Sequence, residues 1–180
     1  SKSRDLLKNT GNHCASEDCY FKEAMTWTDL TSGNLGARFL PRGNIFDIAG
    51  HCAYPVMENG HILALGMFNT KFINKISTVI NATMHFQPGD CRKLPFPKIF
   101  NNSDIVIDLV RKCIGLAKLD WDSYETSWDF TKNPIIRTHQ PNLEQAFSTW
   151  EQQNADAVAE MKRLEKKTIS CLLMLMVYRT

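Results

Sequence analysis

The sequence lacks the patterns that mark most cofactor and metal sites. Its glycines at 60, 66 and 89 stand singly and form no phosphate or dinucleotide loop. The six cysteines include no C-x2-C pair, the spacing typical of zinc sites. We therefore predict no metal site at His13-Cys14, Cys19 or His51-Cys52, and expect free thiols in a reducing cytoplasm.

Long hydrophobic runs and a strong net charge are also missing. The most apolar stretch, residues 171–177, is too short to span a bilayer, so we expect no membrane association. The N-terminus shows no signal-peptide pattern, which favours a cytoplasmic location. With 180 residues, 43% apolar and 22% charged, the chain has the size and composition of one globular domain with room for a helical appendage.

The charge that is present is uneven. Between residues 61 and 100, Asp90 is the only acidic residue. The basic residues of this stretch are Lys71, Lys75, Arg92, Lys93 and Lys98. Such an excess on a nearly neutral protein is typical of a surface that binds a polyanion, although an ordinary solvated surface is equally compatible with it.

The first half of the chain predicts short strands and one helix. Strand-like runs between residues 27 and 49 are interrupted by turn residues at 32–34 and 41–43. The apolar run Ile62–Phe68 resembles a strand buried on both faces. Asn69 or Thr70 caps a predicted helix over 70–82. Its expected apolar stripe is Phe72, Ile76, Val79 and Ile80, with Lys71 and Lys75 on another face.

The second half predicts a helical spacer. Asn102 or Ser103 is expected to cap a helix whose core stripe is Val106, Leu109, Val110, Cys113 and Ala117. Residues 121–130 are expected to form a loop that packs its aromatic rings back onto the domain. A capping box at Asn142 and Gln145 begins a further helix. Its heptad seam comprises Leu143, Phe147, Trp150, Asn154, Ala157, Met161 and Leu164, and fits either a partner helix or the domain itself.

Two blocks of sequence carry a family resemblance. They read L-G-x-x-N-T/S-K at residues 65–71 and N-x-T-x-x-F-Q-x-G-D at 81–90, followed by Leu94-Pro95. They resemble the target-recognition region of large adenine-specific DNA methyltransferases, in particular the PglX-type enzymes of BREX phage-defence systems, with fused type II restriction–methylation enzymes more distant. Stretches at 27–47, 120–130 and 146–150 agree with it in the same order, so the resemblance covers roughly residues 20–167.

The resemblance implies sequence-specific binding of double-stranded DNA on behalf of a methyltransferase. We predict an α+β fold, in which a small twisted β-sheet with packed helices (residues 1–100) precedes a helical spacer (residues 101–180). Candidate phosphate contacts are Lys71, Lys75, Lys93 and Lys98, and candidate base contacts are Arg38, Arg42, Gln87 and Arg92. The alternatives are a helical protein-interaction module that uses the heptad face, or an inactive remnant of such an enzyme.

Catalysis is expected to lie outside this chain. An adenine methyltransferase needs a (D/N/S)-P-P-(Y/F) loop, and the nearest match, Asn133-Pro134-Ile135-Ile136, lacks the second proline and the aromatic ring, so it is predicted to be a turn. Asp120, Asp122 and Asp129 lack the accompanying lysine of a nuclease strand. We therefore assign no catalytic residue here, and expect S-adenosylmethionine to bind a catalytic domain of the same parent protein or of a separate chain.

The C-terminal tail departs from the family pattern after about Lys167. A one-base shift in the reading frame, with permitted codons, turns residues 167–180 into a sequence that resembles how the family continues. This predicts that residues 168–180 are a frameshifted tail, which the coding DNA can test directly.

Overall fold

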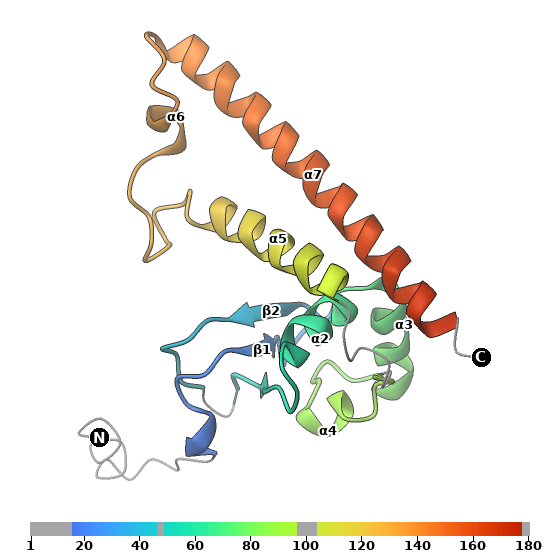
Figure 1. Ribbon diagram of the computed structural model, residues 1–180. Helices are drawn as coiled ribbons and strands as arrows, with labels where there is room; N and C mark the ends of the chain where they lie inside the picture. Colours follow the sequence, from blue (N-terminus) through green and yellow to red (C-terminus); the bar gives the residue numbers. More distant parts are fainter. Residues whose placement is uncertain (1–15, 47–48, 97–103, 178–180) are drawn as a thin grey trace, which may run out of the picture.

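The computed structural model describes residues 16–46, 49–96 and 104–177, with side chains described to residue 174. It is an α+β fold, as predicted, in which a small sheet is covered by helices (Figure 1). The elements in order are η1 (Glu17–Cys19), β1 (Ala24–Trp27), β2 (Ala37–Leu40), β3 (Cys52–Ala53), α2 (Gly60–Phe68), α3 (Lys71–Ile80), α4 (Pro88–Cys91), α5 (Asp104–Trp121), α6 (Pro134–Arg137) and α7 (Leu143–Val177). Within these ranges no helix is long and apolar enough to cross a membrane.

The sheet is antiparallel, with strand order β2-β1-β3. Ala24 pairs with Leu40 at one end of the β1–β2 ladder, and Trp27 pairs with Ala37 at the other. Because side chains alternate across a strand, Met25 and Trp27 both point into the core while Thr26 faces the opposite side. The expected strand pair is therefore present, although its first strand begins before Trp27.

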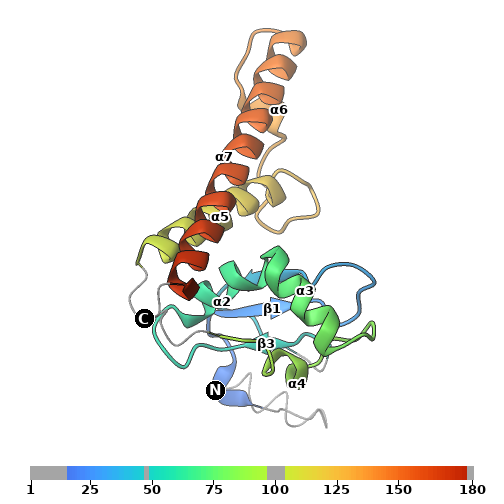
Figure 2. The ribbon, with the colours of Figure 1, turned by 90° about the vertical axis from the view of Figure 1, so that its right-hand side faces the viewer.

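Residues 62–68 form a helix, so the prediction of a buried strand is wrong. Helix α2 lies between the sheet and the later helices (Figure 2), and Ile62, Leu63 and Met67 are at most 1% exposed. Its apolar residues cover its whole circumference, because both sides are buried. Such a run shows no helical periodicity, and leucine, alanine and methionine favour a helix over a strand.

One hydrophobic core draws on both halves of the chain. Met25 and Ile62 from the first half share it with Val106 and Val110 of α5 and with Leu172 of α7. Gly66 lets α2 approach α5 closely, since a Cβ atom there would lie 2.6 Å from Cγ2 of Val110. The predicted boundary near residue 100 falls among residues outside the described ranges, as do the cap candidates Asn102 and Ser103.

Helix α3 has the expected position but not the expected buried face. Ile73 and Ser77 are the buried residues, with Ile76 and Ile80 partly buried against the core. Phe72 and Val79 are 46% and 80% exposed, so the predicted apolar stripe is wrong at those two positions. The rotation of the helix is set by polar contacts of Asn69, Thr70 and Asn74 that the hydrophobic pattern does not encode.

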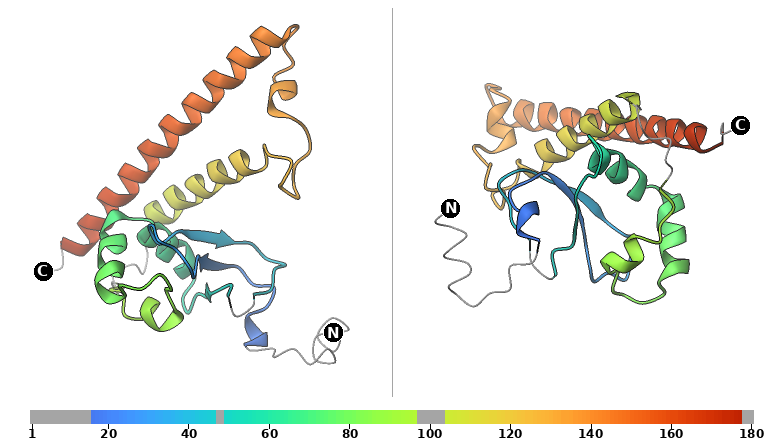
Figure 3. Two further views of the ribbon diagram at one scale, coloured as in Figure 1. Left: turned by 180° about the vertical axis from the view of Figure 1, so that it is seen from behind. Right: turned by 60° about the horizontal axis from the view of Figure 1, so that its bottom comes forward.

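The end of α5, the turns after it, α6 and the start of α7 form an arm that stands clear of the sheet (Figures 1 and 3). Trp121 ends α5 and residues 122–130 form turns, but Trp121, Tyr124 and Trp128 are exposed, so the prediction that these rings pack back on the domain is wrong. Asn133 caps the one-turn helix α6, where a plain turn was predicted. Asn142 accepts from the backbone N–H of Gln145 at the start of α7.

Only the C-terminal part of the predicted heptad seam of α7 packs into the interior. Leu164 is buried, Trp150 and Met161 are half-buried, and Leu143, Phe147, Asn154 and Ala157 are exposed. The buried face of α7 then continues through Thr168 and Leu172, whose side chains pack where α7 passes α5 and α2. The C-terminal segment therefore continues the helix as far as Val177.

The contact at Gly66 predicts a sensitive position. We expect Gly66→Ala to destabilise the fold by about 1–3 kcal/mol, because the new methyl group overpacks the α2–α5 interface. Gly115→Ala on α5 is the matched control: its Cβ would meet nothing within 4 Å. A glycine in an exposed helix costs about 1 kcal/mol relative to alanine, so this control should stabilise the protein. Urea denaturation measures the free energy of unfolding of both variants, and equal effects of the two substitutions would contradict this explanation.

Candidate nucleic-acid interface

Polar contacts of Asn69, Thr70 and Asn74 fix the start of α3. The Asn69 side chain accepts from the backbone N–H of Ala37 at 3.2 Å and donates to the carbonyl of Ala37 at 3.1 Å. Thr70 caps the helix by accepting from Ile73 N–H at 3.2 Å. Asn74 accepts from the backbone N–H of Leu35 at 2.6 Å. The bonds of Asn69 and Asn74 join the start of α3 to β2 and to the β1–β2 connection, and they determine which face of α3 meets solvent.

The segment between α3 and α4 is held by Trp27 and Asp29. Trp27 Nε1 donates to the carbonyl of Phe86 at 2.9 Å, and Phe86 N–H donates to the carbonyl of Asp29 at the same distance. The Asp29 carboxylate accepts from Gln87 Nε2 at 2.8 Å and lies 3.1 Å from Nδ1 of His85. Nε2 of His51, from the edge of β3, lies 3.3 Å from the same carboxylate. The hydrogen bond with His85 holds the pKa of Asp29 below its usual value.

Asp90 joins the two ends of the same segment. Its carboxylate accepts from the backbone N–H of Gln87 at 3.3 Å, which completes a capping box at α4. It also accepts from the side chains of Asn81, at the end of α3, and Lys93, just after α4. These bonds from Lys93 and Asn81 lower the pKa of Asp90. Helix α4 is thereby fixed beside the C-terminal end of α3.

Several residues of the two blocks that carry the family resemblance have a structural role in this scaffold. Gly66, Asn69 and Thr70 from the first block set the packing and cap described above. Asn81 and Asp90 from the second block hold the α3–α4 segment. These residues build and orient the surface formed by α3 and α4, and the solvent-facing residues between them are the ones available to a ligand.

The predicted phosphate contacts lie mainly on this surface. Lys71 and Lys75 are exposed on α3, and in the described part of the chain neither has an acidic partner. Lys93 is exposed but paired with Asp90 at 3.0 Å. Lys98 lies outside the described residues. The structure thus brings Lys71, Lys75 and Lys93 to adjacent elements, with Lys71 near one end of α3 and Lys93 near the other.

The predicted base contacts are more scattered. Arg92 is exposed at the C-cap of α4, next to Lys93, whereas Gln87 at the N-cap of α4 is engaged by Asp29. Arg38 on β2 donates to Oγ1 of Thr28 at 2.8 Å. Arg42 pairs with Glu23 at 3.4 Å, at the end of the hairpin remote from Ala37 and α3. The structure does not bring Arg42 together with the other candidates.

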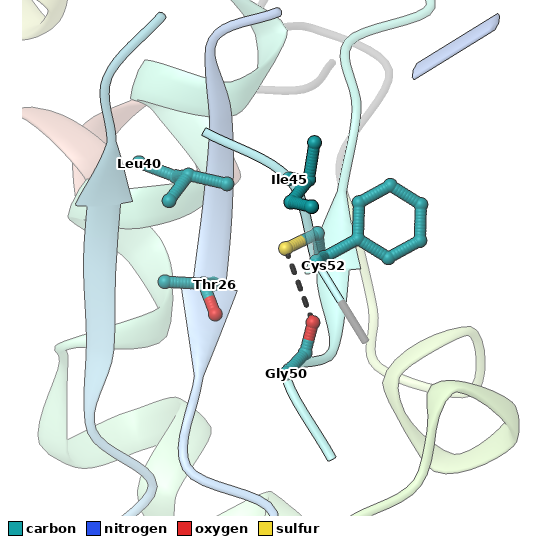
Figure 4. Close-up of a pocket in the computed structure, with 6 residues that line it drawn as sticks. Thr26, Leu40, Ile45, Gly50 and Cys52 are labelled. Carbon is teal, nitrogen blue, oxygen red and sulfur yellow. Dashed lines mark hydrogen bonds between the residues drawn. The ribbon is translucent and has the colours of Figure 1, made fainter. Parts of the chain in front are cut away.

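A separate pocket opens on the face of the sheet away from α2. It has a volume of about 400 Å³ and is lined by Thr26, Leu40, Ile45, Phe46, Gly50 and Cys52 (Figure 4). The Cys52 thiol donates to the carbonyl of Gly50 at 3.3 Å, and burial raises its pKa. A thiol in this state is a poor nucleophile. No pattern in the sequence predicted this pocket.

Metal-ligating side chains do not converge in the described ranges, where no group of three or more such residues could hold an ion. Sequence reasoning also missed the contacts of Asp29. Its contacts with His85 and Gln87 join residues more than fifty positions apart, and no local pattern signals that proximity.

Comparison with known proteins identifies relatives over most of the chain. No protein-family model matches. The chain is 36% identical over 150 residues to the adenine-specific methyltransferase BrxX of Escherichia coli O9:H4 (strain HS). It is 30% identical over 152 residues to the adenine-specific methyltransferase PglX of Lacticaseibacillus casei (strain Zhang). These alignments cover 81% and 82% of this chain but only 12% of each relative. The family resemblance inferred from the sequence is thus confirmed.

The Asp29 contacts predict a pH-dependent contribution to stability. A carboxyl group whose pKa is lowered on folding stabilises the protein above its unfolded pKa of about 3.9, and this contribution is lost as the pH falls through the folded value. We expect Asp29→Asn to be less stable than wild type at pH 7, with the difference shrinking below about pH 4. Asp120→Asn, at an exposed position on α5, is the control. Thermal melts from pH 3 to 7 would contradict this account if both variants followed the same curve.

Proposed function

We propose that this chain, a PglX-like region related to the adenine-specific methyltransferases BrxX and PglX of BREX systems, contributes the DNA-binding specificity of such an enzyme. Its ligand is double-stranded DNA. The chemistry of methyl transfer belongs to a catalytic domain that lies in the rest of a longer parent protein or in a separate chain. That domain, and not this region, would bind S-adenosylmethionine and the target adenine.

The observation that carries this proposal is a pair of exposed lysines on α3, neither of which has an acidic partner among the described residues. Lys71 and Lys75 are four residues apart, so they lie on the same side of the helix and repel each other mildly. The bond from Leu35 N–H to Asn74 and the buried Ile73 and Ser77 hold the other side of α3 against the domain, so the lysines face solvent. A phosphate backbone would turn the repulsion into attraction, and released counterions would add to the binding free energy.

The length of the surface suits a DNA backbone. Helix α3 has ten residues and is about 15 Å long. Lys71 lies in its first turn, and the contact of Asn81 with Asp90 places Lys93 near its other end. Phosphates follow one another about every 3.4 Å of helix axis on each strand, so this length corresponds to roughly four base-pair steps. The lysines can therefore fix the register of the region on DNA.

Among the four candidate base contacts, Arg92 is the best placed to reach a base. It is exposed and flanked by the basic surface, and arginine suits the two acceptors of guanine in the major groove. Gln87 and Arg38 would have to exchange contacts with Asp29 and Thr28 for contacts with a base. Arg42, paired with Glu23 at the remote end of the hairpin, is the least favourably placed.

Salt dependence tests the phosphate contacts. We expect the affinity of the chain for a duplex to fall steeply with salt, and Lys71→Ala/Lys75→Ala to weaken binding to all sequences alike. The slope of log K against log[salt] should decrease by about two, one for each lost contact. Fluorescence anisotropy at several salt concentrations measures both quantities.

The matched control is Lys162→Ala/Lys166→Ala. These two lysines have the same spacing, are also exposed, and lie on α7. The control should bind like wild type. Equal losses in the two double variants would show that net charge alone drives binding, and absence of binding at low salt would overturn the proposal.

A comparison of Arg92→Ala with Gln87→Ala distinguishes a residue that contacts a base from one that stabilises the fold. We expect Arg92→Ala to relax sequence preference at one position, at a cost of about 1–3 kcal/mol for the preferred duplex, without changing the melting temperature. Gln87→Ala should lower the melting temperature, because it removes a hydrogen bond to Asp29. Selection from a random duplex library, combined with thermal melts, distinguishes these outcomes. Unchanged sequence preference in Arg92→Ala would contradict its assignment.

A further inference from the structure

The arm carries almost no core of its own. Within residues 119–150, which span the end of α5, the following turns, α6 and the start of α7, only Ser127 and Ala146 are buried. Figures 1 and 2 show α6 and the start of α7 far from the sheet. Ordering a chain costs conformational entropy, which apolar burial normally offsets. In this segment that burial is missing.

Large apolar side chains are nevertheless frequent along the arm. Trp128 is fully exposed at 101%, and Leu143 is 74% exposed. Five further large apolar residues of the segment are at least 46% exposed: Leu119, Trp121, Tyr124, Ile136 and Phe147. Tryptophan, tyrosine and phenylalanine are enriched at the centres of protein–protein interfaces. Exposed apolar surface of this extent is typical of an interaction site.

The charge of the arm disfavours DNA as its ligand. Residues 119–150 carry five acidic residues (Asp120, Asp122, Glu125, Asp129 and Glu144) against Lys132 and Arg137, and Lys118 at the edge of the arm brings the balance to five against three. Asp122 and Asp129 are held together by Lys118, and Ser127 donates to Asp122 at 2.7 Å. The acidic groups are therefore fixed beside the exposed Trp128. A phosphate backbone would be repelled there, whereas a protein surface with basic residues around an apolar centre would be complementary.

We propose that the arm, residues 119–150, docks onto another part of the same methyltransferase, on a surface with an apolar centre and a basic rim. This inference rests on the proposed function. The aligned segment amounts to 12% of each relative, so most of a PglX-like protein lies outside the region described. The two surfaces then have separate tasks. The basic surface of α3 and α4 faces DNA, and the acidic, aromatic arm joins the recognition region to the enzyme body.

Hydroxyl-radical footprinting tests the docking. The matching segment of E. coli BrxX is replaced by this chain, and oxidation of Trp121 and Trp128 is measured by mass spectrometry in the chimera and in the isolated chain, both without DNA. We expect at least tenfold slower oxidation of both tryptophans in the chimera. Met84, which is 53% exposed and lies outside the arm, is the internal reference and should react equally in both.

Variants and DNA binding complete the test. Trp121→Ser/Trp128→Ser should leave the melting temperature of the isolated chain unchanged, and should expose Tyr124 and Phe147 to oxidation in the chimera. Val56→Ser, at a fully exposed position before α2, is the control and should change neither the melting temperature nor the oxidation of Tyr124 and Phe147. Salt-dependent DNA binding by the same chimera reports on the proposed function separately.

The outcomes distinguish the two proposals. Equal oxidation of the tryptophans in the chimera and the isolated chain would overturn the docking proposal even if DNA binding persists. Protection that appears only when DNA is added would overturn it too, and would assign the arm to nucleic acid. If the chimera does not fold, the segment of unmodified BrxX that aligns with residues 119–150 is footprinted instead, with protection expected and oxidation at the free rate contradicting the proposal.

Discussion

The burial of α2 between the sheet and the long helices is the constraint on which the rest of the structure depends. Met25 and Trp27 of β1 pack below it, and Val110 of α5 and Leu172 of α7 complete the core from the other side. The approach is close enough that position 66 has no room for a Cβ atom. Helix α2 ends at Phe68, and the next residue, Asn69, is hydrogen-bonded to Ala37 of β2. The packing of α2 therefore also fixes where α3 begins.

The polar contacts around α3 and α4 convert this core into an oriented surface. Asn69 and Asn74 hold α3 against the β1–β2 connection, while Asp29 and Asp90 hold the segment that follows it. The bonded residues are unavailable to a ligand in this arrangement. Around α3 and α4, the exposed basic residues without a bond to this scaffold are Lys71 and Lys75 on α3 and Arg92 at the end of α4, within the described part of the chain. Lys93, next to Arg92, is exposed but paired with Asp90.

Much of the fold could be predicted from local pattern. The Thr70 cap, the first part of the α5 stripe (Val106, Leu109 and Val110) and the capping residue Asn142 all have sequence signals that the structure confirms. The predicted stripe is wrong at its end, where Cys113 is only partly buried and Ala117 is exposed. The identity of α2 could not be predicted, because a run buried on every side has no periodicity. Nor could the exposure of Phe72 and Trp128, which depends on contacts between distant segments and on the direction in which α5 carries the chain. The base contacts stay predictions for a similar reason, since Arg38, Arg42 and Gln87 have partners that only the fold reveals.

The central claim is that the lysine face of α3 lies against DNA. Lysine acetylation footprinting of the chain, with and without an excess of duplex at low salt, tests it most directly. The account predicts that Lys71 and Lys75 become protected by DNA, that raising the salt concentration removes this protection, and that Lys162 and Lys166 on α7 react equally in both samples. Equal reactivity of Lys71 and Lys75 with and without bound duplex would contradict it.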